Sequence, residues 1–169
     1  AETINIAEAI KKGTGPYAQL RVFANSAAGL TPESWGWQDM FNDTVVAKNW
    51  VDIVNVSVRV ALASNPRLAE GEQVRIGAGL MSSEKFLANP QAELAKAIAL
   101  KKRLAMEYTQ NLQILASTDN ATMRKQAQEQ NFAIDMFNSL LADIPMRGFV
   151  DDAAVDEASR RIGPKTIIE

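Results

Sequence analysis

The chain contains neither cysteine nor histidine among its 169 residues. Most zinc, haem and iron–sulfur sites and the hydrolytic triads depend on thiolate or imidazole groups, so these classes of chemistry are excluded. Carboxylate sites for Mg²⁺ or Ca²⁺ and serine–lysine pairs need neither group and stay open. We therefore expect no cofactor and no metal. Whether the chain is an enzyme stays open, and the composition favours a protein without enzymatic activity.

Long apolar runs and a strong excess of one charge are also missing. No stretch approaches the roughly 20 consecutive apolar residues that a membrane-spanning helix requires, so the chain is expected to be soluble. The net charge of −2 gives no bulk attraction to a polyanion. The first residue is Ala1 rather than methionine, which fits a cytoplasmic protein after methionine removal or a mature secreted or periplasmic form.

The stretch VDIVNVSVRVALASNP, residues 51–66, is compatible with a strand and with a helix. Its valines alternate with polar residues from position 54 onward, as in a half-buried strand, and valine favours strands. Over a longer window the polar residues recur every three or four positions and would form one stripe on a helix: Thr44, Lys48, Asp52, Asn55 and Arg59. Because burial routinely overrides propensity, the longer pattern predicts a helix that starts near Thr44.

Two long helices are predicted after Pro90. The segments QAELAKAIALKKRLAMEYTQNLQILA and ATMRKQAQEQNFAIDMFNSLLADI are rich in strong helix formers and are joined by the polar segment STDN. Seams with steps of four and three run along them, through Leu94, Ile98, Lys101, Ala105, Tyr108, Leu112 and Leu115 in the first and Met123, Ala127, Gln130, Ile134, Phe137, Leu141 and Ile144 in the second. The short connection predicts an antiparallel hairpin.

Polar residues interrupt both seams and bear on the register of the hairpin. Lys101 interrupts the first seam and Gln130 the second. If the chain turns at residues 117–120, Gln130 comes to lie near Glu107 and Tyr108, where a hydrogen bond could set the register.

These patterns predict a mostly all-α fold, a multi-helix bundle built around a long antiparallel helical hairpin. A single domain, 1–169, is expected, with shorter elements and a Trp-rich segment in 1–89, the hairpin in 90–144, and a short helix and tail in 145–169. The alternative is an α+β fold with short strands near 18–23 and 54–62.

All three tryptophans lie between positions 35 and 50. A buried tryptophan is most often a core anchor, but tryptophan is also over-represented where proteins bind partners. Trp35 and Trp37 would point about 200° apart on a helix, so a monomer buries both only if that helix is covered on two sides. The expected interface combines this segment with the apolar C-terminal tail, and comprises Trp35, Trp37, Met40, Phe41, Ile167 and Ile168.

One pair of residues has the spacing of a catalytic serine and its lysine. Ser82 and Lys85 are three apart, which would place both on one face of a helix, and Ser83 lies beside them. The companion motifs of serine acyl enzymes are incomplete, so a surface pair is favoured over a nucleophile.

Two other groups carry weaker indications. Glu93, Glu107 and Glu129 could face one another across helices, although carboxylate bundles that bind two metals also recruit histidine. The basic residues at 101–103 and 124–125 are not interleaved with aromatic residues, which argues against stacking on a single-stranded nucleic acid.

By elimination, the leading prediction is a non-catalytic structural or assembly protein that acts through protein–protein association. It would be a subunit of a virion, a secretion assembly or another multi-subunit complex, and its partner would be another protein or a second copy. The alternative is a small helical hydrolase that uses carboxylates or the Ser–Lys pair, and a nucleic-acid accessory protein ranks third.

Overall fold

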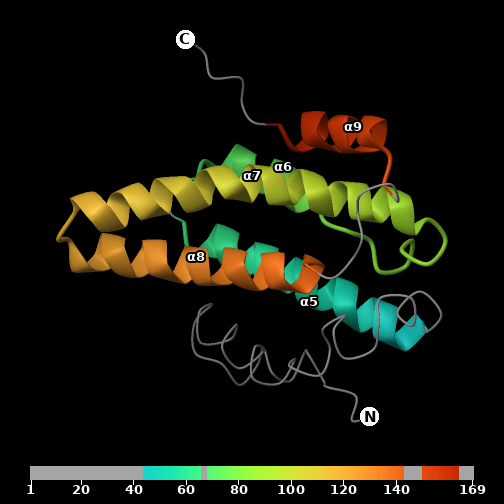
Figure 1. Ribbon diagram of the computed structural model, residues 1–169, viewed down its shortest axis with the longest axis horizontal. Helices are drawn as coiled ribbons and strands as arrows, with labels where there is room; N and C mark the ends of the chain where they lie inside the picture. The colour runs from blue at the N-terminus through green and yellow to red at the C-terminus, as the bar shows by residue number, and fades with distance from the viewer. Residues whose placement is uncertain (1–43, 66–67, 143–149, 164–169) are drawn as a thin grey trace.

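The structure, a computed structural model, describes residues 44–65, 68–142 and 150–163. The helices in these ranges are α5 (Thr44–Ala63), α6 (Glu70–Ala78), α7 (Pro90–Ser117), α8 (Ala121–Leu141) and α9 (Asp152–Ile162). These ranges contain no strand, and α7 and α8 form the predicted antiparallel hairpin (Figure 1). The all-α prediction is confirmed. The alternative strand near 54–62 is wrong, and the one near 18–23 lies outside the described residues.

Side-chain caps determine where the hairpin helices begin. The Asn89 side chain accepts a hydrogen bond from the backbone N–H three residues on, at 3.2 Å, and Pro90 follows in the first turn, where its missing N–H costs nothing. Asn120 caps α8 in the same way, at 3.0 Å. Only residues 118–120 separate the two helices, so α8 must fold back along α7.

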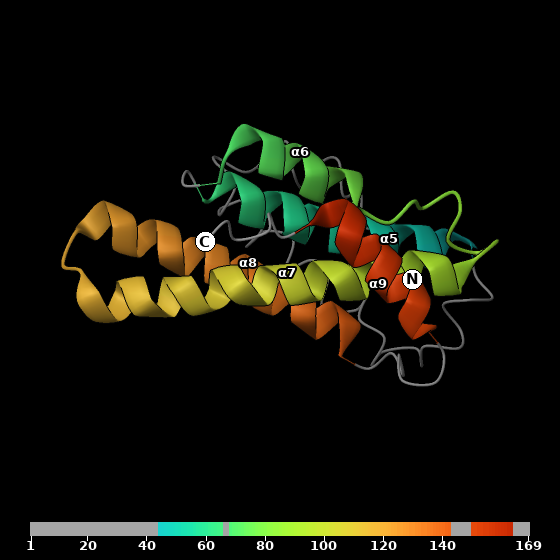
Figure 2. The same ribbon diagram turned by 90° about the horizontal axis from the view of Figure 1, so that it is seen from above.

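The hairpin lies at the centre of the described helices. α5 packs along α8, α9 packs along α7, and α6 contacts both α5 and α9. Figures 1 and 2 show that the loop end of the hairpin extends beyond α5, α6 and α9. None of the described helices is long and apolar enough to cross a membrane.

Burial on most sides explains why the valine-rich α5 is a helix. Val51, Val54 and Val58 are fully buried, and burying one such side chain contributes about 1.5–3 kcal/mol, more than its unfavourable helix propensity. On the predicted polar stripe Lys48 and Arg59 are exposed. Asn55 is instead buried, and its Nδ2 donates a hydrogen bond to the Met81 carbonyl at 2.8 Å.

Asp52 lies on the same stripe and is half-buried. Its burial raises the pKa of the carboxyl above the ordinary value, and the nearby Lys48 and Arg59 oppose that shift. The stripe therefore marks the outer face of α5, with Asn55 as the one position turned inward among these described residues.

Trp50 anchors the core between α5, α8 and the segment that joins α6 to α7. It is fully buried, its Nε1 donates a hydrogen bond to the Leu140 carbonyl at 3.1 Å, and its ring centroid lies 5.7 Å from that of Phe86. This tryptophan thus has the core role that is most common for its residue type.

α9 approaches the end of α6 very closely at Gly79. A Cβ built on Gly79 would lie 2.5 Å from Cγ1 and 2.7 Å from Cδ1 of Ile162, a buried side chain of α9. The φ of Gly79 is −86°, which any residue can adopt, so glycine is required here for space and not for backbone conformation.

Replacing Gly79 with alanine is expected to lower the free energy of unfolding by about 1–2 kcal/mol, because Ile162 must repack. Gly77→Ala is the matched control. A Cβ added to Gly77 would meet no neighbouring element within 4 Å, and alanine favours a helix, so this change is expected to be neutral or to stabilise by up to about 1 kcal/mol. Urea unfolding followed by circular dichroism measures both.

The double variant tests the steric explanation. In an Ile162→Ala background the clashing atoms are gone, so Gly79→Ala should cost almost nothing. If the two substitutions are additive, the contact with Ile162 is not the reason that glycine is needed.

Candidate functional site

The expected interface residues all lie outside the described residues: Trp35, Trp37, Met40, Phe41, Ile167 and Ile168. The residues expected to set the hairpin register, Lys101, Glu107, Tyr108 and Gln130, are all described. Lys101 is exposed on α7, and the other three lie at or near the contact between helices.

A buried ion pair lies where α5 ends against α7. The Glu107 carboxylate accepts a hydrogen bond from the Arg103 guanidinium at 2.8 Å and another from Nδ2 of Asn65 at 2.7 Å. Glu72 of α6 lies 3.5 Å from the same guanidinium. The side chains of Arg103 and Glu107 are only 10% and 6% exposed, so each charge depends on the partners that surround it.

A network of amides continues from this pair toward the loop end of the hairpin. Nδ2 of Asn111 donates to Oε1 of Gln130 at 2.6 Å and to Oδ1 of Asn131 at 2.8 Å. Nε2 of Gln130 donates to the Ala61 carbonyl at 3.0 Å, which ties α8 to α5. We refer to Asn65, Arg103, Glu107, Asn111 and Gln130 together as the polar junction. Its groups bind one another across three helices, so they fix the positions of those helices.

Gln130 finds partners different from those expected. Its hydrogen bonds go to Asn111 and Ala61 instead of Glu107 or Tyr108, while the Tyr108 hydroxyl interacts with Asp135. The Asp135 carboxylate, followed by burial, raises the pKa of Tyr108.

Side-chain direction explains the change of partner. Helical side chains lean toward the N-terminus of their own helix, so a given point on the surface is covered by a residue about one position further along the chain. In an antiparallel hairpin this displacement occurs on both helices, and both partners shift to higher residue numbers. A register counted only from the turn therefore pairs Gln130 with a residue about two positions too early in α7, which accounts for part of the difference between Tyr108 and Asn111.

The seam predicted for α8 agrees with the structure better than that for α7. Along α8 five of the predicted positions are buried: Ala127, Gln130, Ile134, Phe137 and Leu141. Met123 is exposed, and Ile144 lies outside the described residues. Along α7 Leu94 is buried as predicted, but beyond it the buried seam falls one position earlier and includes Ala97, Leu100, Leu104, Glu107 and Asn111. The predicted positions Lys101, Ala105 and Leu112 are exposed. The predicted apolar seam includes neither Glu107 nor Asn111, although Glu107 is expected near Gln130. Hydrogen bonds allow both side chains to be buried.

One pattern in the sequence could have identified the polar junction. Arg103, Glu107 and Asn111 follow one another at intervals of four, which places them on one face of a helix. Asn65 and Gln130 have no comparable local signal, because their partners come from other helices.

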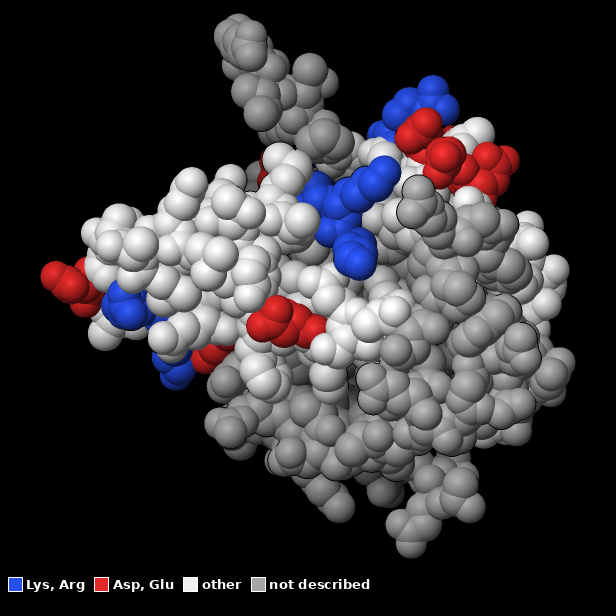
Figure 3. All heavy atoms as spheres, viewed as in Figure 1, with Lys and Arg blue, Asp and Glu red and all other residues white. Residues whose placement is uncertain are grey.

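The loop end of the hairpin has an uncharged surface on α7. We define the hairpin arm as residues 104–128. Within it, Glu107 is the only charged residue between positions 104 and 118, and it is buried. The exposed residues of this part of α7 are Ala105, Met106, Thr109, Gln110, Leu112, Gln113, Ala116 and Ser117. In Figure 3 most of the arm is accordingly white, with charges near its tip and lower edge.

The basic residues at 101–103 and 124–125 do not form one patch of free charge. Arg103 is held in the polar junction, and Arg124 donates hydrogen bonds to the carbonyls of Leu115 and Thr118, which close the loop end of the hairpin. Lys125 is exposed and lies 3.9 Å from Glu129. Two of the cations that the sequence groups together are therefore structural.

The segment with the serine–lysine spacing is not helical. Residues 83–88 form turns, and the Ser82 hydroxyl accepts a hydrogen bond from the backbone N–H of Lys85 at 3.3 Å. The Ser82 backbone N–H in turn donates to the buried Glu93 carboxylate at 2.6 Å. The shared helical face that the spacing requires is absent at Ser82 and Lys85.

The three glutamates that could have formed a metal site are engaged elsewhere. Glu93 binds Lys96 at 3.1 Å as well as Ser82, Glu107 belongs to the polar junction, and Glu129 lies beside Lys125. Among the described residues there is no group of three or more carboxylates that could hold a metal ion.

Comparison of the chain with protein-family models, with curated proteins and with solved structures gives no match.

Proposed function

We propose that this protein is a non-catalytic structural or assembly protein that works by associating with copies of itself or with other proteins, and that the hairpin arm is a contact surface. One observation carries this proposal. The arm projects beyond the other described helices, and its α7 surface combines exposed apolar side chains with an absence of exposed charge (Figures 1 and 3). Leu112 is 50% exposed and Met106 42%. Depletion of charge together with exposed apolar groups is typical of interface cores.

The spacing of the exposed residues suits packing against another helix. Four exposed residues of α7 are spaced by four, three and four positions, which is the spacing of a helix–helix seam: Ala105, Thr109, Leu112 and Ala116. The Thr109 hydroxyl donates to the Ala105 carbonyl at 3.1 Å, so it can leave water without losing its hydrogen bond. The small side chains on either side of Leu112 would let a second helix approach closely.

The polar junction supports the proposal by holding the arm in place. It ties α7 and α8 to α5 where the arm begins, through the contacts of Glu107 with Asn65 and of Gln130 with Ala61. A surface held rigidly before binding loses less conformational entropy when a partner arrives.

Replacing Leu112 with glutamate is expected to weaken self-association by at least about tenfold, because it places a charge at the centre of an apolar contact. Light scattering after gel filtration, over a range of concentrations, measures the mass in solution. The wild-type chain should show a mass above one chain that rises with concentration. Circular dichroism should be unchanged, because Leu112 is half exposed in the single chain.

Val74→Glu is the matched control. Val74 is an exposed apolar residue, 66% exposed, but lies on α6 outside the hairpin arm, so its substitution should leave the mass unchanged. A wild-type chain that stays monomeric at every concentration would refute self-association. Equal effects of the two glutamates would show that the arm is not the contact surface.

A further inference from the structure

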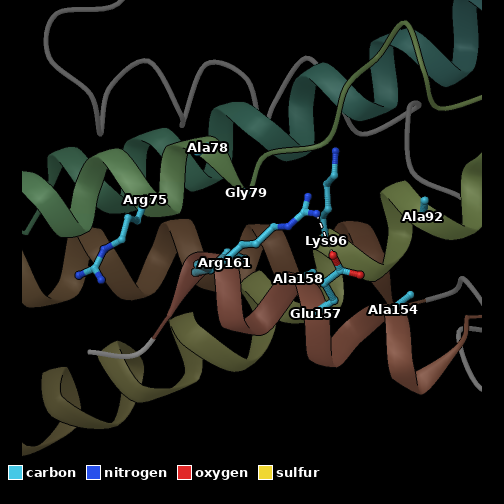
Figure 4. A pocket seen from close by; sticks show the side chains of 10 residues that line it. Arg75, Ala78, Gly79, Ala92, Lys96, Ala154, Glu157, Ala158 and Arg161 are labelled. Carbon is cyan, nitrogen blue, oxygen red and sulfur yellow. Dashed lines mark hydrogen bonds and ion pairs between the residues drawn. The ribbon is translucent and has the colours of Figure 1, made fainter. Parts of the chain in front are cut away.

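A cavity of about 420 Å³ lies between the end of α6, the first half of α7 and α9. Its volume falls within the range of roughly 300–1,000 Å³ that is usual for small-molecule sites. The residues that line it come from all three helices: Arg75, Ala78, Gly79, Ala92, Lys96, Ala154, Glu157, Ala158, Arg161 and Ile162 (Figure 4). It is separate from the polar junction and from the hairpin arm, since it shares no residue with either.

Small side chains create this space. Ala154 and Ala158 are four apart on α9, so they share one face of that helix, and both line the cavity together with Ala92 of α7. Gly79 contributes no side chain, and Ile162 closes against it. The cavity therefore has a largely apolar wall, which would accept the hydrocarbon part of a ligand.

Three cations from three helices line the same cavity, against a single carboxylate. Arg75, Lys96 and Arg161 contribute positive charge and Glu157 negative charge. In Figure 4 the side chains of Arg161 and Lys96 are both seen in the middle of the view, whereas Arg75 lies at one end and points away from them. The side chains that line the cavity thus carry a net positive charge. Lys96 of α7 and Arg161 of α9 are each paired with one carboxylate, Glu93 and Glu157 respectively.

Lys96 and Arg161 both have hydrogen-bond donors beyond those that these pairs use. The carboxylate bound to Lys96 is Glu93, at 3.1 Å, and an ammonium group has three donors. Arg161 binds Glu157 at 2.8 Å, but that pair is 75% and 58% exposed, so solvent screens it and a ligand could replace it at little cost. A guanidinium group has five donors in a planar fork that matches a carboxylate.

We propose that this cavity binds a small organic anion, a carboxylate that carries a short hydrocarbon chain. Lys96 and Arg161 bind the carboxylate group, and the alanine wall of Ala92, Ala154 and Ala158 accepts the chain. Arg75 adds to the positive potential at the other end of the cavity and is not required for direct contact. The proposal is independent of self-association through the hairpin arm.

Isothermal titration of the full chain with octanoate tests this binding, with octylammonium, which has the same chain and the opposite charge, as the comparison ligand. Octanoate is expected to bind at one site per chain with an affinity that falls as salt rises. Octylammonium should not bind at this site. Lys96→Gln and Arg161→Gln should each weaken octanoate binding by about tenfold, the loss of one charge-assisted hydrogen bond.

Adjacent cations provide matched controls. Lys101 and Arg160 are exposed and do not line the cavity, so Lys101→Gln and Arg160→Gln remove the same net charge but should leave octanoate binding unchanged. Ala158→Leu, which fills the cavity without changing the charge, should abolish binding while circular dichroism shows that the fold is retained.

Several results would overturn the proposal. They are the absence of saturable octanoate binding, equal binding of octylammonium, or equal effects of Arg160→Gln and Arg161→Gln. Inorganic phosphate that binds as tightly as octanoate would refute the role given to the alanine wall.

Discussion

Replacing Glu107 with alanine is expected to lower the free energy of unfolding by about 3 kcal/mol, because the buried Arg103 guanidinium loses its nearest anion. Glu72, at 3.5 Å, compensates only in part, and Asn65 loses an acceptor at 2.7 Å. Glu107→Gln keeps an acceptor for Asn65 but removes the charge, so a smaller loss of about 1–2 kcal/mol is expected. Urea unfolding followed by circular dichroism measures each loss.

Glu157→Ala is the control for this experiment. Glu157 and Arg161 have the same spacing in sequence and the same 2.8 Å separation as Glu107 and Arg103, but they lie at the surface. Water and salt screen the exposed pair, so its loss should cost less than about 0.5 kcal/mol. Equal losses for the two glutamates would contradict the importance of burial.

A double variant separates the stabilisation that the Arg103–Glu107 ion pair contributes from the destabilisation caused by a buried guanidinium group without an anion. If the damage in Glu107→Ala comes from the unpaired guanidinium, replacing Arg103 by methionine and Glu107 by leucine together should recover most of the lost stability. A double variant less stable than Glu107→Ala would show that the ion pair itself stabilises the fold.

Truncating Trp50 to alanine is expected to cost about 3–5 kcal/mol, the usual range for a large aromatic residue in a core. The substitution removes the contact with Phe86 and the hydrogen bond to the Leu140 carbonyl. Circular dichroism is the appropriate signal for the unfolding curve, because the substitution itself changes tryptophan fluorescence.

Trp50→Phe separates the stability lost with the aromatic contact from the stability lost with the hydrogen bond. It keeps an aromatic ring beside Phe86 but leaves the Leu140 carbonyl without its donor, so a loss of about 1–2 kcal/mol is expected. Val74→Ala removes an exposed apolar side chain and should change stability by less than about 0.5 kcal/mol. If Trp50→Ala lowers the free energy of unfolding no more than Val74→Ala does, Trp50 is not a core anchor.

The helices themselves could be predicted from local patterns. Asn89, Pro90 and Asn120 signal the starts of α7 and α8, and polar residues at three- and four-residue steps indicate that α5 is a helix despite its valines. These signals depend on neighbours within one or two turns, so the sequence contains them in full. The seam of α8 was predictable for the same reason, because its inward residues are mostly apolar.

The inward face of α7 could not be predicted in the same way. Its middle part buries Glu107 and Asn111, whose charge and amide are satisfied by Arg103, Asn65 and Gln130. Apolar periodicity reads such residues as exposed, since it takes no account of hydrogen-bond partners from other helices. The proposed contact surface on the hairpin arm could also be predicted only in part. The uncharged stretch of α7 is visible in the sequence, but its projection beyond the other described helices is not.

The sequence by itself determined the class of the fold, the hairpin and its turn, and the absence of thiol and imidazole chemistry, because these depend on composition and on local spacing. Only the tertiary structure decided which polar residues are buried, that Gly79 must make room for Ile162, and that Arg75, Lys96 and Arg161 line one cavity. The physical reason is that burial and charge convergence are properties of contacts between distant segments. Side-chain direction and helix packing set those contacts, and neither is encoded in the spacing along a single helix.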